Sequence, residues 1–248
     1  MAEAETIVVR GTARWGRPRI YLFAAQVGVM AASVGFAKTF FSPLLAGTFS
    51  APPIVYIHGM FLFGWVGLFL FQSLLIQRAQ LRLHRRLGWV GAALAAGVIV
   101  STVGIVLYSS RRMAAAGDYL GANSQLLIVL LDLAVFGLLV GFAVSNRKRP
   151  DVHRRLMLLS LVQALAPAWF RFRHYFPSVE HPLIWFGLLL ADSLILVAVL
   201  YDNRRFGRVH PVYLFVGIPL FIMHAGEVTL TETGPFEKAA AALGSLLL

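Results

Sequence analysis

Residues 125–144 read QLLIVLLDLAVFGLLVGFAV, and the basic triplet Arg147–Arg149 follows two residues later. At a rise of 1.5 Å per residue this run extends about 30 Å as a helix, which is the thickness of the hydrocarbon core of a bilayer. Asp132 is its only charged residue. An apolar run that ends at a basic cluster is typical of a transmembrane helix entering the cytoplasm.

Six further apolar runs surround this one along the chain: Ile20–Ala37, Ile54–Ile76, Leu87–Tyr108, Leu156–Phe170, Leu183–Leu200 and Val212–Val228. The sequence is 58% hydrophobic and 13% charged, whereas charged residues make up about a quarter of a soluble domain. We therefore predict an all-α integral membrane bundle of seven transmembrane helices. The chain has no cysteine, which excludes disulfides, thiolate catalysis and metal centres with Cys ligands.

The basic residues predict the orientation of these helices. One set of loops holds sixteen of the 22 Lys and Arg residues: Arg10, Arg14, Arg17, Arg19, Arg78, Arg82, Arg85, Arg86, Arg147, Lys148, Arg149, Arg154, Arg155, Arg204, Arg205 and Arg208. The opposite side holds Lys38, Arg111, Arg112, Arg171, Arg173 and Lys238. Because cytoplasmic loops are enriched in Lys and Arg, we predict a cytoplasmic N-terminus and an outer C-terminus. We divide the chain into a basic cytoplasmic segment (1–19), the transmembrane domain (20–230) and a short outer tail (231–248).

The net charge of +11 could also indicate a nucleic-acid-binding protein. That interpretation needs a basic face on a folded soluble module, and the basic residues lie instead in short clusters between apolar runs. Anionic lipid headgroups at the cytoplasmic face are the expected partner, and nucleic acid is not. Partner subunits within the membrane are a further possibility.

Three cytoplasmic turns end alike. Each places a His where a helix re-enters the membrane: His84 in RLHRRL, His153 in DVHRRL and His210 in RVHPVY. We therefore expect one lone span followed by three hairpins. Two interpretations are open. The three imidazoles converge on a metal or an anionic ligand, or each one caps a helix or contacts headgroups.

Ionisable residues within a transmembrane span are costly and by default indicate function. His58, Asp132, Asp192 and His224 fall in the outer halves of four predicted spans. On the second span His58, Trp65 and Gln72 recur every seven residues, which places them on one face, toward the interior of the bundle.

These residues suggest a cofactor site. His58 and His224, with Trp65 and Gln72 nearby, could hold haem b. A divalent metal could be bound by Asp132 and Asp192 or by His84, His153 and His210. Binding of no cofactor is equally consistent with the sequence, because the buried acids could instead pair between helices or conduct protons. We expect a haem- or metal-binding membrane protein in electron transfer or cofactor handling. The alternatives are an accessory subunit of a larger complex and a zinc-dependent membrane hydrolase, and enzymatic activity is left open.

Several motifs resemble known families. The stretches HGMFLFGW (58–65), LFLFQS (68–73) and LHRRLGW (83–89) resemble a group of bacterial seven-span membrane proteins without an assigned activity. This resemblance implies a bacterial cytoplasmic (inner) membrane location. The H-R pairs at His84 and His153 are similar to a helix-entry step in some cytochrome b561-type proteins and heme A synthases. Seven-span zinc hydrolases of the adiponectin-receptor and alkaline-ceramidase type resemble the chain in topology. Their last span carries H-x-x-x-H, whereas His210 and His224 here lie fourteen residues apart.

Overall fold

The computed structural model describes residues 18–231 and 233–248, and all regular structure in these residues is helical. The predicted basic segment 1–19, with Arg10, Arg14 and Arg17, falls outside the described residues except for its last two positions.

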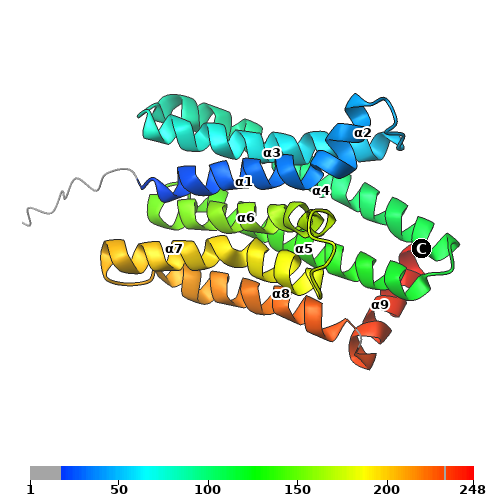
Figure 1. Cartoon of the computed structure of the whole chain (residues 1–248). Helices are drawn as coiled ribbons and strands as arrows, with labels where there is room; N and C mark the ends of the chain where they lie inside the picture. The colour runs from blue at the N-terminus through cyan, green and yellow to red at the C-terminus, as the bar shows by residue number, and fades with distance from the viewer. Residues whose placement is uncertain (1–17, 232) are drawn as a thin grey trace, which may run out of the picture.

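The helices follow one another in a simple order. They are α1 (Ile20–Phe36), the π-helical turn η1 (Ala37–Phe41), α2 (Ser42–Leu45), α3 (Pro53–Gln77), α4 (Leu81–Ala115), α5 (Tyr119–Ser145), α6 (Pro150–Phe170), the 3₁₀ turn η2 (Arg171–His174), the π-helical η3 (Leu183–Leu190), α7 (Ala191–Phe206), the π-helical η4 (Tyr213–Gly217), α8 (Ile218–Leu230) and α9 (Gly234–Leu247). Short turns join antiparallel neighbours, so the long helices lie side by side as one bundle (Figure 1).

Six helical segments are long and apolar enough to cross a membrane: Ile20–Leu45, Pro53–Gln77, Leu81–Ala115, Tyr119–Ser145, Leu183–Phe206 and Tyr213–Leu230. Their outward faces carry large apolar side chains such as Val100, Leu138, Phe142 and Phe215, each more than half exposed. A soluble protein does not expose apolar surface on this scale. The chain is therefore a multi-pass membrane protein.

Helix α6 is long but not among the six apolar segments, and its place in the bundle explains why. It contacts α1, α3, α5, α7 and η3 and runs between α1 and α7 in Figure 1. Eleven of its 21 residues are buried, including Arg155, Ser160 and Gln163. Because its neighbours cover it on most sides, α6 can carry polar side chains that a lipid-facing helix could not.

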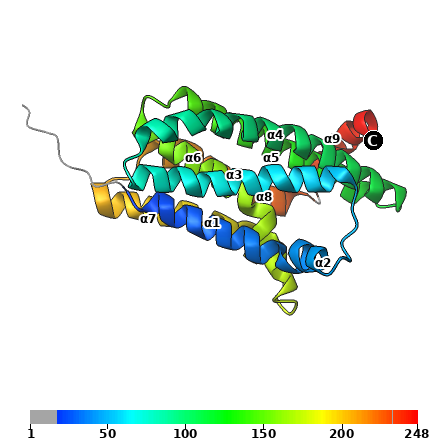
Figure 2. The ribbon, with the colours of Figure 1, turned by 90° about the horizontal axis from the view of Figure 1, so that it is seen from above.

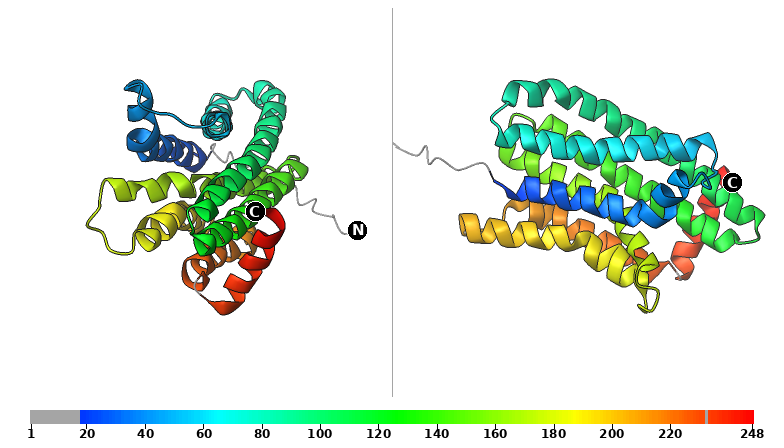
Figure 3. Two further views of the ribbon diagram at one scale, coloured as in Figure 1. Left: turned by 90° about the vertical axis from the view of Figure 1, so that its right-hand side faces the viewer. Right: turned by 45° about the horizontal axis from the view of Figure 1, so that its top comes forward.

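The two ends of the bundle differ in character. The start of α1 and the turns α3–α4, α5–α6 and α7–η4 lie together at one end, which we call the hairpin end (Figures 1 and 2). The opposite end carries α2, the α4–α5 turn, the α6–η3 connection and α9. Figure 3 (left) views the molecule from this opposite end, with α9 beside α5. The three predicted basic turns are thus the three turns of the hairpin end.

Several predicted boundaries differ from the structure. The third predicted run, Leu87–Tyr108, lies within the much longer α4, which takes in the basic RLHRR segment because charged side chains are tolerated where a helix leaves the bilayer. The predicted tail 231–248 forms α9, which packs against α5. At the C-terminal end of α9, the Leu247 carbonyl accepts a hydrogen bond from the Arg111 guanidinium at 3.1 Å.

Candidate functional site

The strongest polar cluster inside the bundle begins with an imidazole and a carboxylate. His224 on α8 is 7% exposed and Asp192 on α7 is 4% exposed. The Nδ1 atom of His224 lies 3.0 and 2.9 Å from the two carboxylate oxygens of Asp192. One proton is therefore held between the ring and the carboxyl group, whichever of the two carries it.

Gln163 on the central helix α6 connects this pair to a second acid. Its Oε1 lies 2.9 Å from Nε2 of His224, and its Nε2 donates to Oδ1 of Asp132 at 2.6 Å. An amide oxygen only accepts hydrogen bonds, so Nε2 of His224 carries a proton in this arrangement. Both ring nitrogens of His224 are then in use.

The chain of hydrogen bonds ends at a pair of acids. The carboxyl group of Asp132 lies beside that of Glu227, one turn beyond His224 on α8, and the two groups interact directly. Two ionised carboxylates repel each other, so a hydrogen bond between them needs one proton. Glu227 Oε1 is buried and receives no hydrogen bond from a donor in the described part of the chain. Asp192, His224, Gln163, Asp132 and Glu227 together are called the relay below.

Four helices supply the relay, and two π-helical segments precede its members. The π segment η3 ends one residue before α7, whose second residue is Asp192, and η4 leads directly into α8. A π-helical turn contains an extra residue and rotates the side chains that come after it, and such turns are frequent at functional sites. Asp132 lies at the midpoint of α5, thirteen residues from each end, so the relay reaches deep into the bundle.

An apolar layer separates the relay from the hairpin end. Along α6, Gln163 lies eight residues from Arg155, which is about 12 Å. Leu156, Leu159 and Ile195 fill this interval and are all buried. Ser160 is also buried there, and its hydroxyl donates to the Met157 carbonyl of its own helix at 2.8 Å. The Asp132–Glu227 end is half-buried, so the relay is more open at that end than toward the hairpin end.

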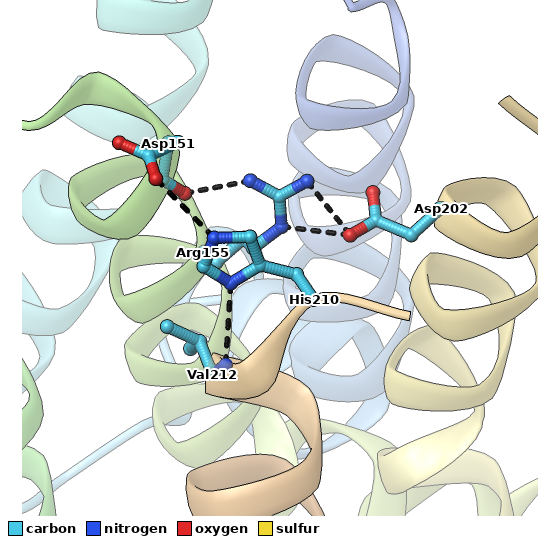
Figure 4. Close-up of polar contacts among 5 residues, drawn as sticks. All are labelled: Asp151, Arg155, Asp202, His210 and Val212. Carbon is cyan, nitrogen blue, oxygen red and sulfur yellow. Dashed lines mark hydrogen bonds and ion pairs between the residues drawn. The ribbon is translucent and has the colours of Figure 1, made fainter. Parts of the chain in front are cut away.

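A second polar network lies at the hairpin end (Figure 4). Arg155 donates from Nε and from a terminal nitrogen to Asp202 Oδ2, at 2.8 and 2.7 Å, and both side chains are at most 3% exposed. Its other terminal nitrogen donates to the Asp151 carbonyl at 2.7 Å. From the sequence Arg155 is only one of the orientation signals, but the structure places it in a buried ion pair.

His210 belongs to this network and not to a set of three imidazoles. The Val212 N–H donates to its Nδ1 at 3.2 Å, and its Nε2 lies 3.3 Å from Asp151 Oδ2 (Figure 4). Nδ1 therefore accepts and Nε2 donates, which is the neutral ring. Burial and the charge of Arg155 lower the pKa of His210, which agrees with this form.

The other two hairpin histidines lie in the first turns of α4 and α6. His153 Nδ1 donates to the Ala143 carbonyl at 2.8 Å. Gln72 donates to the His84 carbonyl at 3.3 Å, while His84 Nδ1 and Gln72 Oε1 are buried without a hydrogen-bond partner among the described residues. His84 and His153 are close enough for their charges to interact. Convergence of the hairpin imidazoles on a ligand stays a prediction.

The face of α3 that carries His58, Trp65 and Gln72 is directed toward neighbouring helices. His58 Nδ1 lies 3.3 Å from the Ser101 hydroxyl on α4. Trp65 is buried with its ring 5.3 Å from that of Phe136 on α5, and Gln72 is bonded to the first turn of α4. His58 is thus bonded to α4, whereas His224 is engaged by α6 and α7.

The predicted cofactor residues fit a haem or metal poorly as arranged. Among residues 18–231 and 233–248, no group of three or more His, Asp or Glu side chains is placed to hold a metal ion. His224 offers no free ring nitrogen to an iron, because Asp192 and Gln163 occupy both. Asp132 and Asp192 lie on opposite sides of the Gln163–His224 link, not around one point. Haem or metal binding stays a prediction.

Gln163 and Glu227 carry as much of this site as the three predicted residues Asp132, Asp192 and His224. Both are visible as polar residues in apolar helices, but the sequence gives no signal that they join His224 to Asp132. No family model, curated protein or solved structure matches this chain. Its function is therefore inferred from the side chains themselves.

Proposed function

We propose that this chain is a proton-handling membrane protein in which the relay binds and transfers protons within the bilayer. The observation that carries the proposal is the unbroken series of hydrogen bonds from Asp192 through His224, Gln163 and Asp132 to Glu227. Each end of this series holds a proton that can be exchanged: one between Asp192 and His224, and one between Asp132 and Glu227. Ionisable groups kept inside a membrane are the usual components of proton pathways.

Gln163 gives the relay two protonation states. In the arrangement described, its oxygen accepts from protonated His224 and its nitrogen donates to ionised Asp132. Rotating the amide by half a turn exchanges these roles, so the nitrogen donates to His224 and the oxygen accepts from protonated Asp132. The second state has one proton fewer on His224 and one more on Asp132. The amide carries no proton across, so His224 releases its proton on the Asp192 side and Asp132 takes one from Glu227. The orientation of the Gln163 amide therefore matches the protonation states of its two neighbours.

The surroundings favour access from one side. The half-buried acid pair is the more open end of the relay, whereas Leu156, Leu159 and Ile195 close the direction of the hairpin end. A relay closed on one side suits alternating access better than an open channel. We propose that the bundle has seven spans, namely the six apolar segments and α6. In this topology the hairpin end lies in the cytoplasm and α9 lies outside. A bacterial inner membrane is the proposed location.

Proton flux into liposomes tests the proposal. The purified protein would be reconstituted with a pH-sensitive dye inside the vesicles, and a pH gradient would be imposed across the membrane. Flux above that of protein-free vesicles is expected for the unaltered chain, with a loss to the protein-free rate in Asp132→Asn and Gln163→Leu. Gln72→Leu is the matched control, since Gln72 lies outside the relay, and it should retain flux. Equal flux in all four proteins, or none in the unaltered chain, would refute the proposal.

The functions expected from sequence lead to different results. A haem gives a visible absorption band that changes on reduction, and bound zinc gives metal content without colour. An accessory subunit co-purifies with other chains. Gentle purification followed by a visible spectrum and elemental analysis separates these from a proton relay that needs no cofactor. A haem band that is lost in His224→Ala would overturn the relay. His224 would then bind the haem iron through Nε2, the nitrogen that the relay needs for its hydrogen bond to Gln163.

A further inference from the structure

A cluster of cations lies at the end of the bundle opposite the hairpins. Arg171 and Arg173 come from η2, directly after α6, and Lys38 comes from η1, directly after α1. Half of the six basic residues that the sequence assigns to this end are thus gathered in one place. The charges of all three act on His174, the last residue of η2. These three side chains are called the Arg171 cluster.

The two arginines are held in place by rings and carbonyls. The guanidinium of Arg171 lies 4.0 Å from the ring centroid of Phe36 on α1 and donates to the Pro167 carbonyl at 2.8 Å. The guanidinium of Arg173 lies 3.8 Å from the Phe170 ring centroid and donates to the Phe170 carbonyl at 3.1 Å. A guanidinium has five N–H donors, so each arginine is positioned and still has donors available.

Lys38 is tied to the same segment. Its ammonium group donates to the His174 carbonyl at 2.9 Å and lies 4.3 Å from the Tyr175 ring centroid. The Tyr175 hydroxyl donates to the Val34 carbonyl on α1 at 2.8 Å. The ends of α1 and α6 are thereby fastened together, and much of the ordering that a bound ligand would require is already present.

In the part of the chain that the structure describes, the cluster forms no ion pair with a carboxylate. None of the three ion pairs in the described residues includes Lys38, Arg171 or Arg173. Burial and the neighbouring Arg173 lower the pKa of Arg171 to about 10. Repulsion among fixed cations is relieved by a bound anion.

We infer that the Arg171 cluster is a binding site for a phosphate-type anion. Two guanidinium groups with free donors and one ammonium group suit an oxyanion with several acceptor oxygens. The cluster directly follows the ends of two membrane helices, which is the depth at which lipid phosphates lie. The same chemistry accepts the phosphate of an anionic lipid or a free phosphate ion. The site is separate from the relay and does not depend on the proposed function.

The test measures binding of each source to the full-length protein. Inorganic phosphate is titrated onto the protein in detergent by calorimetry, with Trp169 fluorescence as a second readout because its ring lies 5.1 Å from that of Phe172 in η2. Phosphatidylglycerol and phosphatidylcholine are compared by native mass spectrometry. The variants are Arg171→Gln, Arg173→Gln and the control Arg112→Gln, which removes an exposed cation at the same end.

Loss of a charge-assisted hydrogen bond predicts at least about tenfold weaker binding in Arg171→Gln or Arg173→Gln, and no change in Arg112→Gln. If inorganic phosphate binds and its binding is weakened in Arg171→Gln and Arg173→Gln but not in Arg112→Gln, the ligand is a free anion. Retention of phosphatidylglycerol over phosphatidylcholine by the same pattern identifies a lipid headgroup. Arg173→Gln keeps the test decisive if Arg171→Gln fails to fold, since the Arg173 guanidinium bonds to Phe170 in its own segment. Equal weakening in Arg112→Gln, or no binding of either probe, would overturn the inference.

Discussion

Nε2 of His224 lies 2.9 Å from Oε1 of Gln163, and in this orientation of the amide the buried imidazole carries a proton on that nitrogen. The amide oxygen accepts, so the ring nitrogen must donate. A histidine that looks from the sequence like a ligand to iron is here a hydrogen-bond donor. The same reasoning applies to Asp132 and Glu227 at the other end of the relay, because two carboxyl groups in contact also need a proton between them.

The shared proton of the acid pair is expected to be visible by infrared spectroscopy. The unaltered protein should show the C=O stretch of a protonated carboxylic acid at neutral pH, since Asp132 and Glu227 cannot both ionise at hydrogen-bonding distance. Asp132→Asn should reduce this band, because Glu227 can then ionise beside an amide. Glu237→Gln on α9 is the control and should leave the band unchanged. Absence of the band from the unaltered protein would contradict the assigned pair.

Breaking the buried ion pair at the hairpin end is expected to destabilise the fold. Arg155→Met leaves the Asp202 charge buried without a partner, which costs about 3–5 kcal/mol of unfolding free energy. The double variant Arg155→Met, Asp202→Leu removes both charges and should recover most of the loss. Denaturation in detergent mixtures measures these differences, with exposed Arg86→Met as the neutral control. A double variant no more stable than Arg155→Met would show that the pair is not the cause.

Acidification is expected to destabilise the fold at His210, because a second ring proton removes the acceptor that Nδ1 offers to the Val212 N–H. The pKa of His210 is lowered by burial and by Arg155. Partial burial acts to raise the pKa of Asp151, but the hydrogen bond from His210 and backbone N–H groups leave it lowered. Groups with lowered pKa values stabilise the fold above their unfolded pKa, so stability is lost first below about pH 6.5 and further below about pH 4.

The melting temperature measured as a function of pH tests whether stability falls on acidification. His210→Gln keeps an N–H donor to Asp151 but cannot gain a charge. The unaltered protein should lose more stability than this variant between about pH 8 and about pH 5. A difference between the two proteins that stays constant over this range would contradict the prediction.

The close approach of α1 and α6 predicts a severe effect at Gly35. A Cβ atom there would overlap the Ala168 carbonyl oxygen, which is backbone and cannot move aside. Gly35→Ala should therefore cost about 1–3 kcal/mol of stability. Gly59→Ala is the control, because no atom lies within 4 Å of its added Cβ. It should be neutral or slightly stabilising, since alanine favours helix. A smaller effect at Gly35 than at Gly59 would disprove the tight contact.

The lack of cysteine makes the proposed topology directly testable. Single cysteines at Thr48 and Ser178 lie in exposed loops opposite the hairpin end, and Gln80→Cys lies in the α3–α4 turn. In intact cells a membrane-impermeant maleimide should label the first two but not the third. Lysed cells serve as the control, in which all three should react. Labelling of Gln80→Cys alone in intact cells would reverse the orientation.

Much of the fold was predictable from apolar runs, because lipid imposes helices of fixed length. The six apolar segments overlap predicted runs, and the remaining predicted run, Leu156–Phe170, lies within helix α6 (Pro150–Phe170). The π-helical segments before Asp192 and His224 had no sequence signal, and neither did the extension of α4 to Ala115.

The site was predictable only as a set of residues. His224, Asp192 and Asp132 were identified because charge is costly in lipid. Sequence gives the depth of a residue but not its neighbours, so the link through Gln163 could not be deduced. For the same reason the sequence could not show that His58 bonds to Ser101 and does not face His224.

The burial of α6 also bears on how the chain enters the membrane. A nascent helix with Arg155, Ser160 and Gln163 on its surface partitions poorly into lipid by itself. The side chains of Arg155 and Gln163 also bind partners on α5, α7 and α8, and the last two helices are synthesised after α6. Insertion of α6 must therefore be cooperative, with the helix held at the translocon or against α1 and α5 until the C-terminal hairpin arrives. Truncation before α7 would leave the most central helix of the protein as its least stably inserted one.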